Sequence, residues 1–201
     1  MNVPVYGTKL TLGLVEGKLK EHGLYGKANL NVVSHRKTVR MGCMAVEFIR
    51  VNHSIPDAVG MAVHTPAGII VHTGDFKIDY SPINGEIIDL TRFGELGSKG
   101  VLALMADSTN AERPGYTQSE RKVGESFEKL FTKAEGKRII IATFSSNIHR
   151  IQQIVNCAEK YGRKVAVFGR SMINVISTAI ELGYLDVPKG IILSLIHISE
   201  P

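Results

Sequence analysis

Hydrophobic residues in the first half of the chain fall into short runs separated by polar residues and turn signals. Between residues 30 and 73 these runs are rich in β-branched side chains and have the length of strands. Thr65-Pro66-Ala67-Gly68 lies between two of them and predicts a tight hairpin turn. The pattern predicts strands at residues 30–33, 38–41, 46–51, 61–65 and 69–73.

One helix is predicted ahead of these strands. Thr8 can cap it, and it ends near Gly23, a residue that commonly follows a helix. Gly13 and Gly17 lower the helix propensity, so we expect them to allow close packing against a sheet. After the strands, the pattern predicts an irregular connection over residues 76–100.

The second half of the chain begins after a buried strand at 101–106 and the Pro114-Gly115 pair. Helices and strands then alternate with short loops, which is typical of a parallel sheet covered by helices. We therefore place a domain boundary near residue 115. Thr117 and Glu120 have the spacing of a capping box. The predicted elements are helix 117–133, strand 138–142, helix 147–161, strand 164–168 and helix 172–182.

Charge divides the chain at the same place. Residues 1–110 hold 11 Lys and Arg against 10 Asp and Glu, whereas residues 111–170 hold 12 against six. A basic segment favours a polyanionic partner such as nucleic acid, and an ordinary solvated surface is the alternative. No apolar run reaches the ~18 residues of a membrane span, and we expect a cytoplasmic protein that does not bind membranes. Cys43 and Cys157 are isolated in sequence and are expected to be small buried residues.

Three polar side chains each follow a predicted strand of the first half: His53, Asp75 and Asp107. Imidazole and carboxylate groups are zinc ligands, and neighbouring strand ends would bring them to one sheet edge. Each residue alone has a simpler interpretation, as a hydrogen-bonded loop histidine, a turn residue or a loop cap. Their occurrence together favours a site. His72 is expected either to orient a ligand or to form a turn.

A second candidate site lies where the strand ending at residue 142 leads into a helix. Hydroxyl groups and free backbone amides at a helix N-terminus favour anions, and an ordinary N-cap is the alternative. The candidates for phosphate contact are Ser145, Ser146, Asn147 and Arg150.

Five segments together resemble the ribonuclease J family, which are nucleases with a metallo-β-lactamase fold and a β-CASP insertion. These are residues 4–8, 52–57, 72–77, 107–111 and 144–153. The resemblance covers about residues 2–190 and implies an α/β fold. It places part of a metallo-β-lactamase αββα sandwich at 1–115 and the start of a parallel α/β β-CASP domain at 116–190. The tail, 191–201, departs from the family pattern, and we expect it to be non-native.

By this resemblance, His53 matches a histidine that binds one zinc ion, Asp75 matches a carboxylate that bridges two, and Asp107 matches the first acidic β-CASP motif. The implied activity is hydrolysis of RNA phosphodiester bonds, as a 5′-to-3′ exonuclease and an endonuclease in RNA processing and decay. The family's His-x-His-x-Asp-His motif and its later β-CASP histidines are missing. We therefore expect a central fragment that is inactive alone, with RNA as partner and homo-oligomers only for the full-length protein.

Two other functions are compatible with the sequence. A non-catalytic RNA-binding fragment would use the basic second half without any metal. A small-molecule metallo-hydrolase would use the same ligands, but it would have no need of a basic surface after residue 115.

Overall fold

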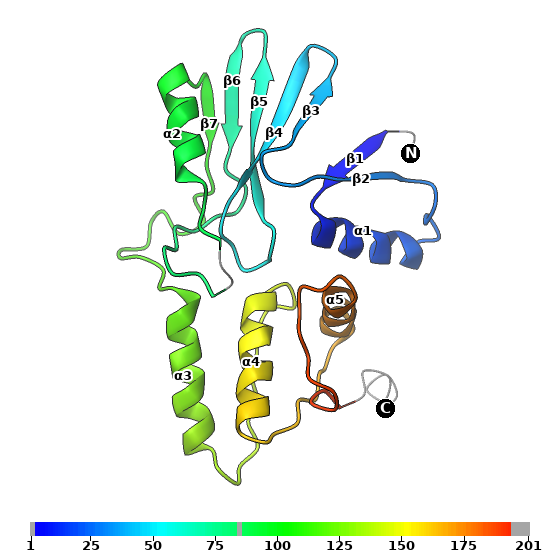
Figure 1. Cartoon of the computed structure of the whole chain (residues 1–201), viewed down its shortest axis with the longest axis vertical. Coiled ribbons are helices and arrows are strands. Elements are labelled where there is room, and N and C mark those ends of the chain that lie inside the picture. Colours follow the sequence, from blue (N-terminus) through cyan, green and yellow to red (C-terminus); the bar gives the residue numbers. More distant parts are fainter. Residues whose placement is uncertain (1–2, 84–85, 194–201) are drawn as a thin grey trace.

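The computed structural model describes residues 3–83 and 86–193, and it places a β-sheet above a layer of helices (Figure 1). We call the unit from β3 (Thr38–Met41) to β7 (Ala103–Met105) the sheet part. The unit from α3 (Glu120–Lys133) to residue 193 is called the helical part. The elements are β1 (Pro4–Gly7), α1 (Lys9–Glu21), β2 (Asn29–Val32), β3 (Thr38–Met41), β4 (Met44–Arg50), β5 (Val59–Thr65), β6 (Gly68–His72), α2 (Leu90–Lys99), β7 (Ala103–Met105), α3 (Glu120–Lys133), α4 (Ile148–Lys160) and α5 (Arg170–Glu181).

The five strands of the sheet part lie in sequence order, β3-β4-β5-β6-β7. The first four pair antiparallel, with tight turns between β3 and β4 and between β5 and β6 and a longer loop, residues 51–58, between β4 and β5. Strand β7 pairs parallel to β6, with His72 opposite Met105. The hydroxyl of Thr65 accepts hydrogen bonds from the amides of Ala67 and Gly68, which closes the predicted β5–β6 hairpin. A separate parallel pair joins β1 and β2. The mixed α/β class and the strands of this half are confirmed, but the expectation that the strand at 101–106 is buried was wrong. Strand β7 lies at the edge of the sheet and its side chains are exposed.

Helix α2 was missed by the sequence interpretation, which assigned residues 76–100 to an irregular connection. The side chain of Asp89 caps it by accepting a hydrogen bond from the Arg92 amide. Gly94 and Gly97 obscured the helical pattern, because glycine is a poor helix former. The fully buried Leu96 packs α2 onto the sheet, against Ile49, Ala62 and Val71.

Helix α1 forms as predicted and lies against β1 and β2, but its Gly13 approaches a helix and not a sheet. Leu10 is fully buried in the core of the helical part, together with Ile148 and Ile176. A Cβ atom at Gly13 would lie 2.7 Å from Leu182 Cδ1, so a larger residue there would have to displace the Leu182 side chain at the end of α5. At Gly17 the same atom would meet open space. Figure 1 shows α1 directly above α5.

The three predicted helices of the helical part are present, but its two predicted strands are not. Residues 138–142 and 164–168 are extended without strand pairing, apart from a single parallel bridge between Val165 and Ile192. A strand forms only where another backbone lies alongside, and among the described residues that happens at one position. Ile140 is consequently 90% exposed and Phe168 75% exposed. The predicted non-native tail, residues 191–201, lies outside the described residues from position 194 onward.

Three smaller expectations have mixed outcomes. Helix α3 begins at Glu120 and is capped by Ser119, so the capping box at Thr117 was wrong. Cys157 is buried as expected, but Cys43 is exposed at the turn between β3 and β4. Within the described part of the chain, none of the helices combines the length and apolar character needed to cross a membrane.

Candidate functional site

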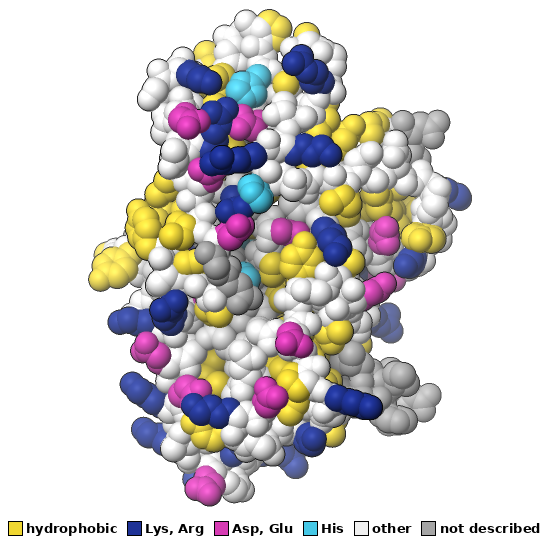
Figure 2. Space-filling model, viewed as in Figure 1, with side chains coloured by type: hydrophobic (Ala, Val, Ile, Leu, Met, Phe, Trp, Pro, Cys, Tyr) yellow, Lys and Arg dark blue, Asp and Glu magenta, His cyan; other side chains and the backbone are white. Residues whose placement is uncertain are grey.

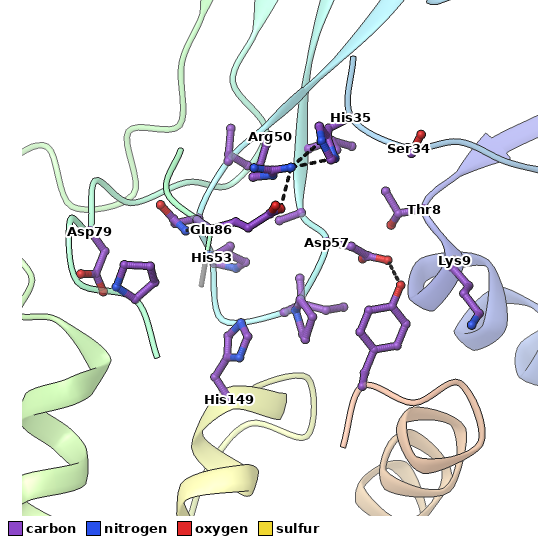
Figure 3. A pocket seen from close by; sticks show the side chains of 18 of the residues that line it. Thr8, Lys9, Ser34, His35, Arg50, His53, Asp57, Asp79, Glu86 and His149 are labelled. Atoms are coloured by element: carbon purple, nitrogen blue, oxygen red, sulfur yellow. Dashed lines mark hydrogen bonds and ion pairs between the residues drawn. The ribbon is translucent and has the colours of Figure 1, made fainter. Parts of the chain in front are cut away.

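A cavity of about 460 Å³ lies at the junction of the sheet part, α1 and the helical part. His53 lines it from the loop after β4, and His149 lines it from the start of α4 (Figure 3). Acidic and basic side chains both contribute to its wall, and Figure 2 shows the same mixture of signs over this face of the molecule. Of the predicted site residues, the cavity is lined by His53, and His149 lies next to the segment predicted to contact phosphate.

His53 and Asp75 come together as predicted. The Nε2 atom of His53 lies 3.9 Å from Asp75 Oδ2, and the side chains are 37% and 80% exposed. Asn52 fixes the start of the His53 loop, because its side chain donates to the carbonyl of Glu86 and accepts from the amide of Ile88, both at 2.7 Å. Two strand-end loops thus present an imidazole and a carboxylate side by side.

Asp107 is held beside this pair by a threonine. The Thr73 amide donates to the Met105 carbonyl, and its hydroxyl accepts from the Asp107 amide, both at 3.0 Å. Asp107 Oδ1 accepts hydrogen bonds from the hydroxyl and the amide of Thr109, at 2.6 and 2.9 Å. These bonds lower the pKa of Asp107, so it is ionised at neutral pH. Asp107 therefore lies near the pair and also caps its own loop.

His72 acts as a turn former in this structure. Its Nδ1 atom accepts a hydrogen bond from the Gly74 amide at 3.0 Å. Gly74 has a φ of +63°, and a Cβ atom there would lie 2.8 Å from the carbonyl oxygen of Val59. Only glycine fits both constraints, so this turn places Asp75 beside His53.

The His53–Asp75 pair fits two positions of a zinc site. Two ligands that each bind at about 2.0–2.2 Å can be up to ~4.2 Å apart, and an imidazole nitrogen and a carboxylate oxygen are both zinc donors. The separation of 3.9 Å lies within that limit. The described residues contain no group of three or more His, Cys, Asp or Glu side chains that could hold a metal ion. The pair therefore supplies part of a metal site.

Three of the four predicted phosphate contacts, Ser145, Asn147 and Arg150, make side-chain interactions within the protein. Asn147 is buried and caps α4, accepting from the Arg150 amide at 3.1 Å. Ser145 shares a hydrogen bond with Ser171 at 3.0 Å. The Arg150 guanidinium donates to Glu120 at 2.7 Å, so its charge is balanced locally. The geometry shows the N-cap alternative in place, and the phosphate contacts of Ser145, Ser146, Asn147 and Arg150 stay a prediction.

His149 was missed by the sequence interpretation, although it adjoins the segment selected as an anion site. Its Nδ1 atom is buried and has no hydrogen-bond partner among the described residues. Burial lowers its pKa, and Lys77 adds to this effect, so the ring is neutral at pH 7. The Nζ atom of Lys77 lies 3.4 Å from Asp79 Oδ2 and 3.8 Å from Glu120 Oε1. The cavity floor thus combines a neutral imidazole with a network of ion pairs.

Comparison with known proteins shows which family this chain resembles. Residues 136–200 match the family model "Ribonuclease J, beta-CASP domain", a range that includes most of the tail we had set apart. Ribonuclease J of Synechocystis sp. is 48% identical over 192 residues, which are 95% of this chain and 30% of that protein. Ribonuclease J 1 of Streptococcus pyogenes is 50% identical over 94% of this chain and 33% of that protein. Ribonuclease J2 of Bacillus subtilis is 44% identical over 97% and 35%.

One solved structure supports the fold alone. It is a protein of unknown function from Enterococcus faecalis, which aligns with a TM-score of 0.67 and 18% identity over 92% of this chain and 45% of that one. The described residues thus form a mixed α/β protein that includes β-CASP sequence. The chain belongs to the ribonuclease J family. It spans about a third of the length of the curated relatives it matches.

Proposed function

We propose that this chain carries part of the active site of a zinc-dependent ribonuclease. The enzyme would hydrolyse RNA phosphodiester bonds in the cytoplasm, as a 5′-to-3′ exonuclease and an endonuclease in RNA processing and decay. The observation that carries the proposal is the 3.9 Å separation of His53 Nε2 and Asp75 Oδ2 beside Asp107, at a junction with a basic α/β segment. The names of the curated relatives support the same substrate class.

His53 and Asp75 would hold metal through Nε2 and a carboxylate oxygen. When two zinc ions are bound, they would supply a more acidic water and stabilise charge on the phosphoryl group. Asp107 keeps one oxygen bonded to Thr109, so its other oxygen can orient a neighbouring ligand or a water. Because Asp75 is 80% exposed, an RNA backbone would reach this edge directly from solvent.

The number of ligands limits what the 201 residues do alone. A catalytic zinc ion needs about three protein ligands, and the pair supplies two. We therefore expect the isolated chain to bind zinc weakly and to leave RNA intact. A homo-oligomer is expected only for a longer protein that contains this sequence.

The proposal is tested by sequencing the source DNA on both sides of this reading frame and assaying the longer protein that it encodes. Zinc-dependent cleavage of a 5′-monophosphorylated RNA should fall at least ~100-fold in Asp75→Ala, which removes a metal ligand. Glu135→Ala, an exposed carboxylate after α3, is the matched control and should keep the wild-type rate. Cleavage that is unaffected by Asp75→Ala would reject the assigned site. Stoichiometric zinc and RNA cleavage in the 201-residue chain would reject the ligand argument.

A second function, RNA binding without catalysis, is favoured by the charge of residues 111–170, which hold 12 Lys and Arg against six acids. It predicts RNA affinity that falls steeply with salt concentration and is unchanged by a chelator. A natural start at Met1 and a stop after Pro201, together with such binding, would favour this function over the nuclease.

A further inference from the structure

The loop that carries His53 ends at a residue with an unusual backbone conformation. Asp57 has a φ of +56°, in the left-handed region that a side chain with a Cβ atom enters at a cost. Such conformations persist where the surrounding contacts hold them, and they concentrate at functional sites. The contacts of Asp57 therefore show what fixes this loop.

The Asp57 carboxylate binds two segments that are remote in sequence. Its Oδ2 atom accepts a hydrogen bond from the Tyr184 hydroxyl at 2.5 Å and from the Leu10 amide at 3.2 Å, and Figure 3 shows the first of these contacts. The Leu10 amide is one of the free donors at the first turn of α1, where a negative charge is favourable. The Oδ1 atom is buried without a hydrogen-bond partner among the described residues.

Tyr184 brings the helical part into this contact. It follows α5 and lines the same cavity as His53. Burial and the hydrogen bond to Asp57 both raise the pKa of its phenol. The hydroxyl therefore remains a donor over the whole physiological pH range.

The other end of the loop is held separately, by the sheet part. Asn52 binds the backbone at Glu86 and Ile88, and the Val51 amide donates to the Ala58 carbonyl at 3.1 Å. None of these bonds involves α1 or the helical part. Asp57 thus supplies the side-chain hydrogen bonds that tie the His53 loop to α1 and the helical part, next to Ile55 of the same loop, which packs against the helical core.

We propose that Asp57 is a positioning residue for the His53 loop and that its bond to Tyr184 couples the loop to the helical part. This inference rests on the proposed function in so far as His53 is a metal ligand. Because the helical part carries the basic segment, a movement of that part when RNA binds would pull on the Asp57–Tyr184 bond. The placement of a metal ligand would then depend on how the polyanion is held.

The coupling is tested first in the 201-residue chain without metal, by amide hydrogen exchange. Tyr184→Phe removes the hydroxyl and should speed exchange in residues 53–58 about tenfold, the effect of losing one hydrogen bond to a charged group. The matched control is Tyr161→Phe. The Tyr161 hydroxyl donates to Glu128 at 2.8 Å, a contact wholly within the helical part, so the His53 loop should not change.

Substitutions at Asp57 separate its side-chain bonds from its backbone conformation. Asp57→Asn keeps an oxygen acceptor and tolerates the left-handed conformation, so it should restore most of the protection that Asp57→Ala loses. Asp57→Gly removes the acceptor and relieves the backbone, and it should behave like Asp57→Ala if the bonds are what matter. Ultraviolet titration of the tyrosines should show the pKa of Tyr184 falling in Asp57→Ala.

The outcomes distinguish this inference from the proposed function. Faster exchange throughout the chain in Tyr184→Phe would mean a general loss of stability and would overturn the coupling, as would an unchanged loop. Faster exchange confined to residues 53–58 supports it. In the longer protein, zinc affinity weakened by Tyr184→Phe but not by Tyr161→Phe supports the role in metal binding. A coupled loop in a protein that binds no zinc would leave the coupling intact and reject the nuclease.

Discussion

The sheet part and the helical part build their cores in opposite ways. The core of the sheet part joins Ile49, Ala62, Val71 and Leu96, all within about fifty residues of one another. The core of the helical part joins Leu10, near the start of the chain, to a run of residues that ends at Leu185. A core built from neighbouring hairpins forms from local contacts, whereas the other must bring distant segments together first. The difference explains which elements the sequence could reveal.

The largest predicted effect is at Leu96, and it tests whether the two cores unfold separately. Leu96→Ala removes a fully buried side chain from the sheet core and should destabilise the protein by about 3 kcal/mol. Denaturant unfolding measures the total loss of unfolding free energy, and hydrogen exchange shows which elements lose stability. Amides of β5 should lose protection well before those of α4. An equal loss in both would show that the two cores unfold as one unit.

The next largest effect concerns a charge buried beneath α2. The Arg92 guanidinium donates to both Glu47 oxygens, at 2.7 and 2.9 Å, and this interaction lowers the pKa of Glu47. A depressed folded-state pKa stabilises the fold above the unfolded value near pH 4.5, and the contribution is lost as the pH falls through the folded pKa. Glu47→Gln should cost about 2 kcal/mol at pH 7 and flatten acid denaturation below pH 4.5.

Glu95 provides the control for this prediction. It pairs with the same Arg92, but its side chain is 52% exposed. Glu95→Gln should change the free energy of unfolding by less than about 0.5 kcal/mol, because exposed ion pairs contribute little. If Glu47→Gln and Glu95→Gln lost equal stability, burial of Glu47 would not be the reason for its larger contribution.

A smaller pair of effects tests whether α1 belongs to the helical core. Gly13→Ala places a methyl group 2.7 Å from Leu182 and should destabilise the protein by about 1–2 kcal/mol through overpacking. Gly17→Ala has open space and should stabilise it by roughly 0.5–1 kcal/mol, through helix propensity. Thermal unfolding should show a lower melting temperature for Gly13→Ala and a higher one for Gly17→Ala than for the unsubstituted protein. Stabilisation by Gly13→Ala would contradict the α1–α5 contact.

The smallest effect is expected at Ile140, on the unpaired extended segment of the helical part. The side chain is 90% exposed, so Ile140→Lys should change the stability by no more than about 0.5 kcal/mol. Light scattering should show less self-association, because a charge replaces an exposed apolar residue on an extended edge. A loss of more than about 1.5 kcal/mol would contradict the exposure of this side chain.

The sequence predicted those features that depend on neighbouring residues. The hairpin at Thr65, helix α1 and the approach of His53 to Asp75 all follow from strand-length runs and the turns that end them. Helix α2 was hidden by two glycines, although Asp89 was a readable cap. Strands 138–142 and 164–168 had the right composition, but strand pairing is a property of two segments and a single run cannot show it.

The contacts of the candidate site were likewise only partly predictable. The Asp57–Tyr184 bond joins residues 127 apart, and the Arg150–Glu120 pair joins residues 30 apart. No periodicity or spacing links such positions, so the contacts of the cavity emerged only from the fold. The approach of His53 to Asp75 was predictable, and these long-range partners were not.

The uneven burial of the two cysteines makes the chain easy to label at one position. Cys43 is exposed at the β3–β4 turn, whereas Cys157 is buried on α4, and burial raises the pKa of its thiol. A maleimide dye needs an accessible thiolate, so it should attach at Cys43 and spare Cys157. The unmodified sequence thus accepts a single fluorophore on the sheet part. A second dye on a bound RNA would report by energy transfer how far that part lies from the nucleic acid.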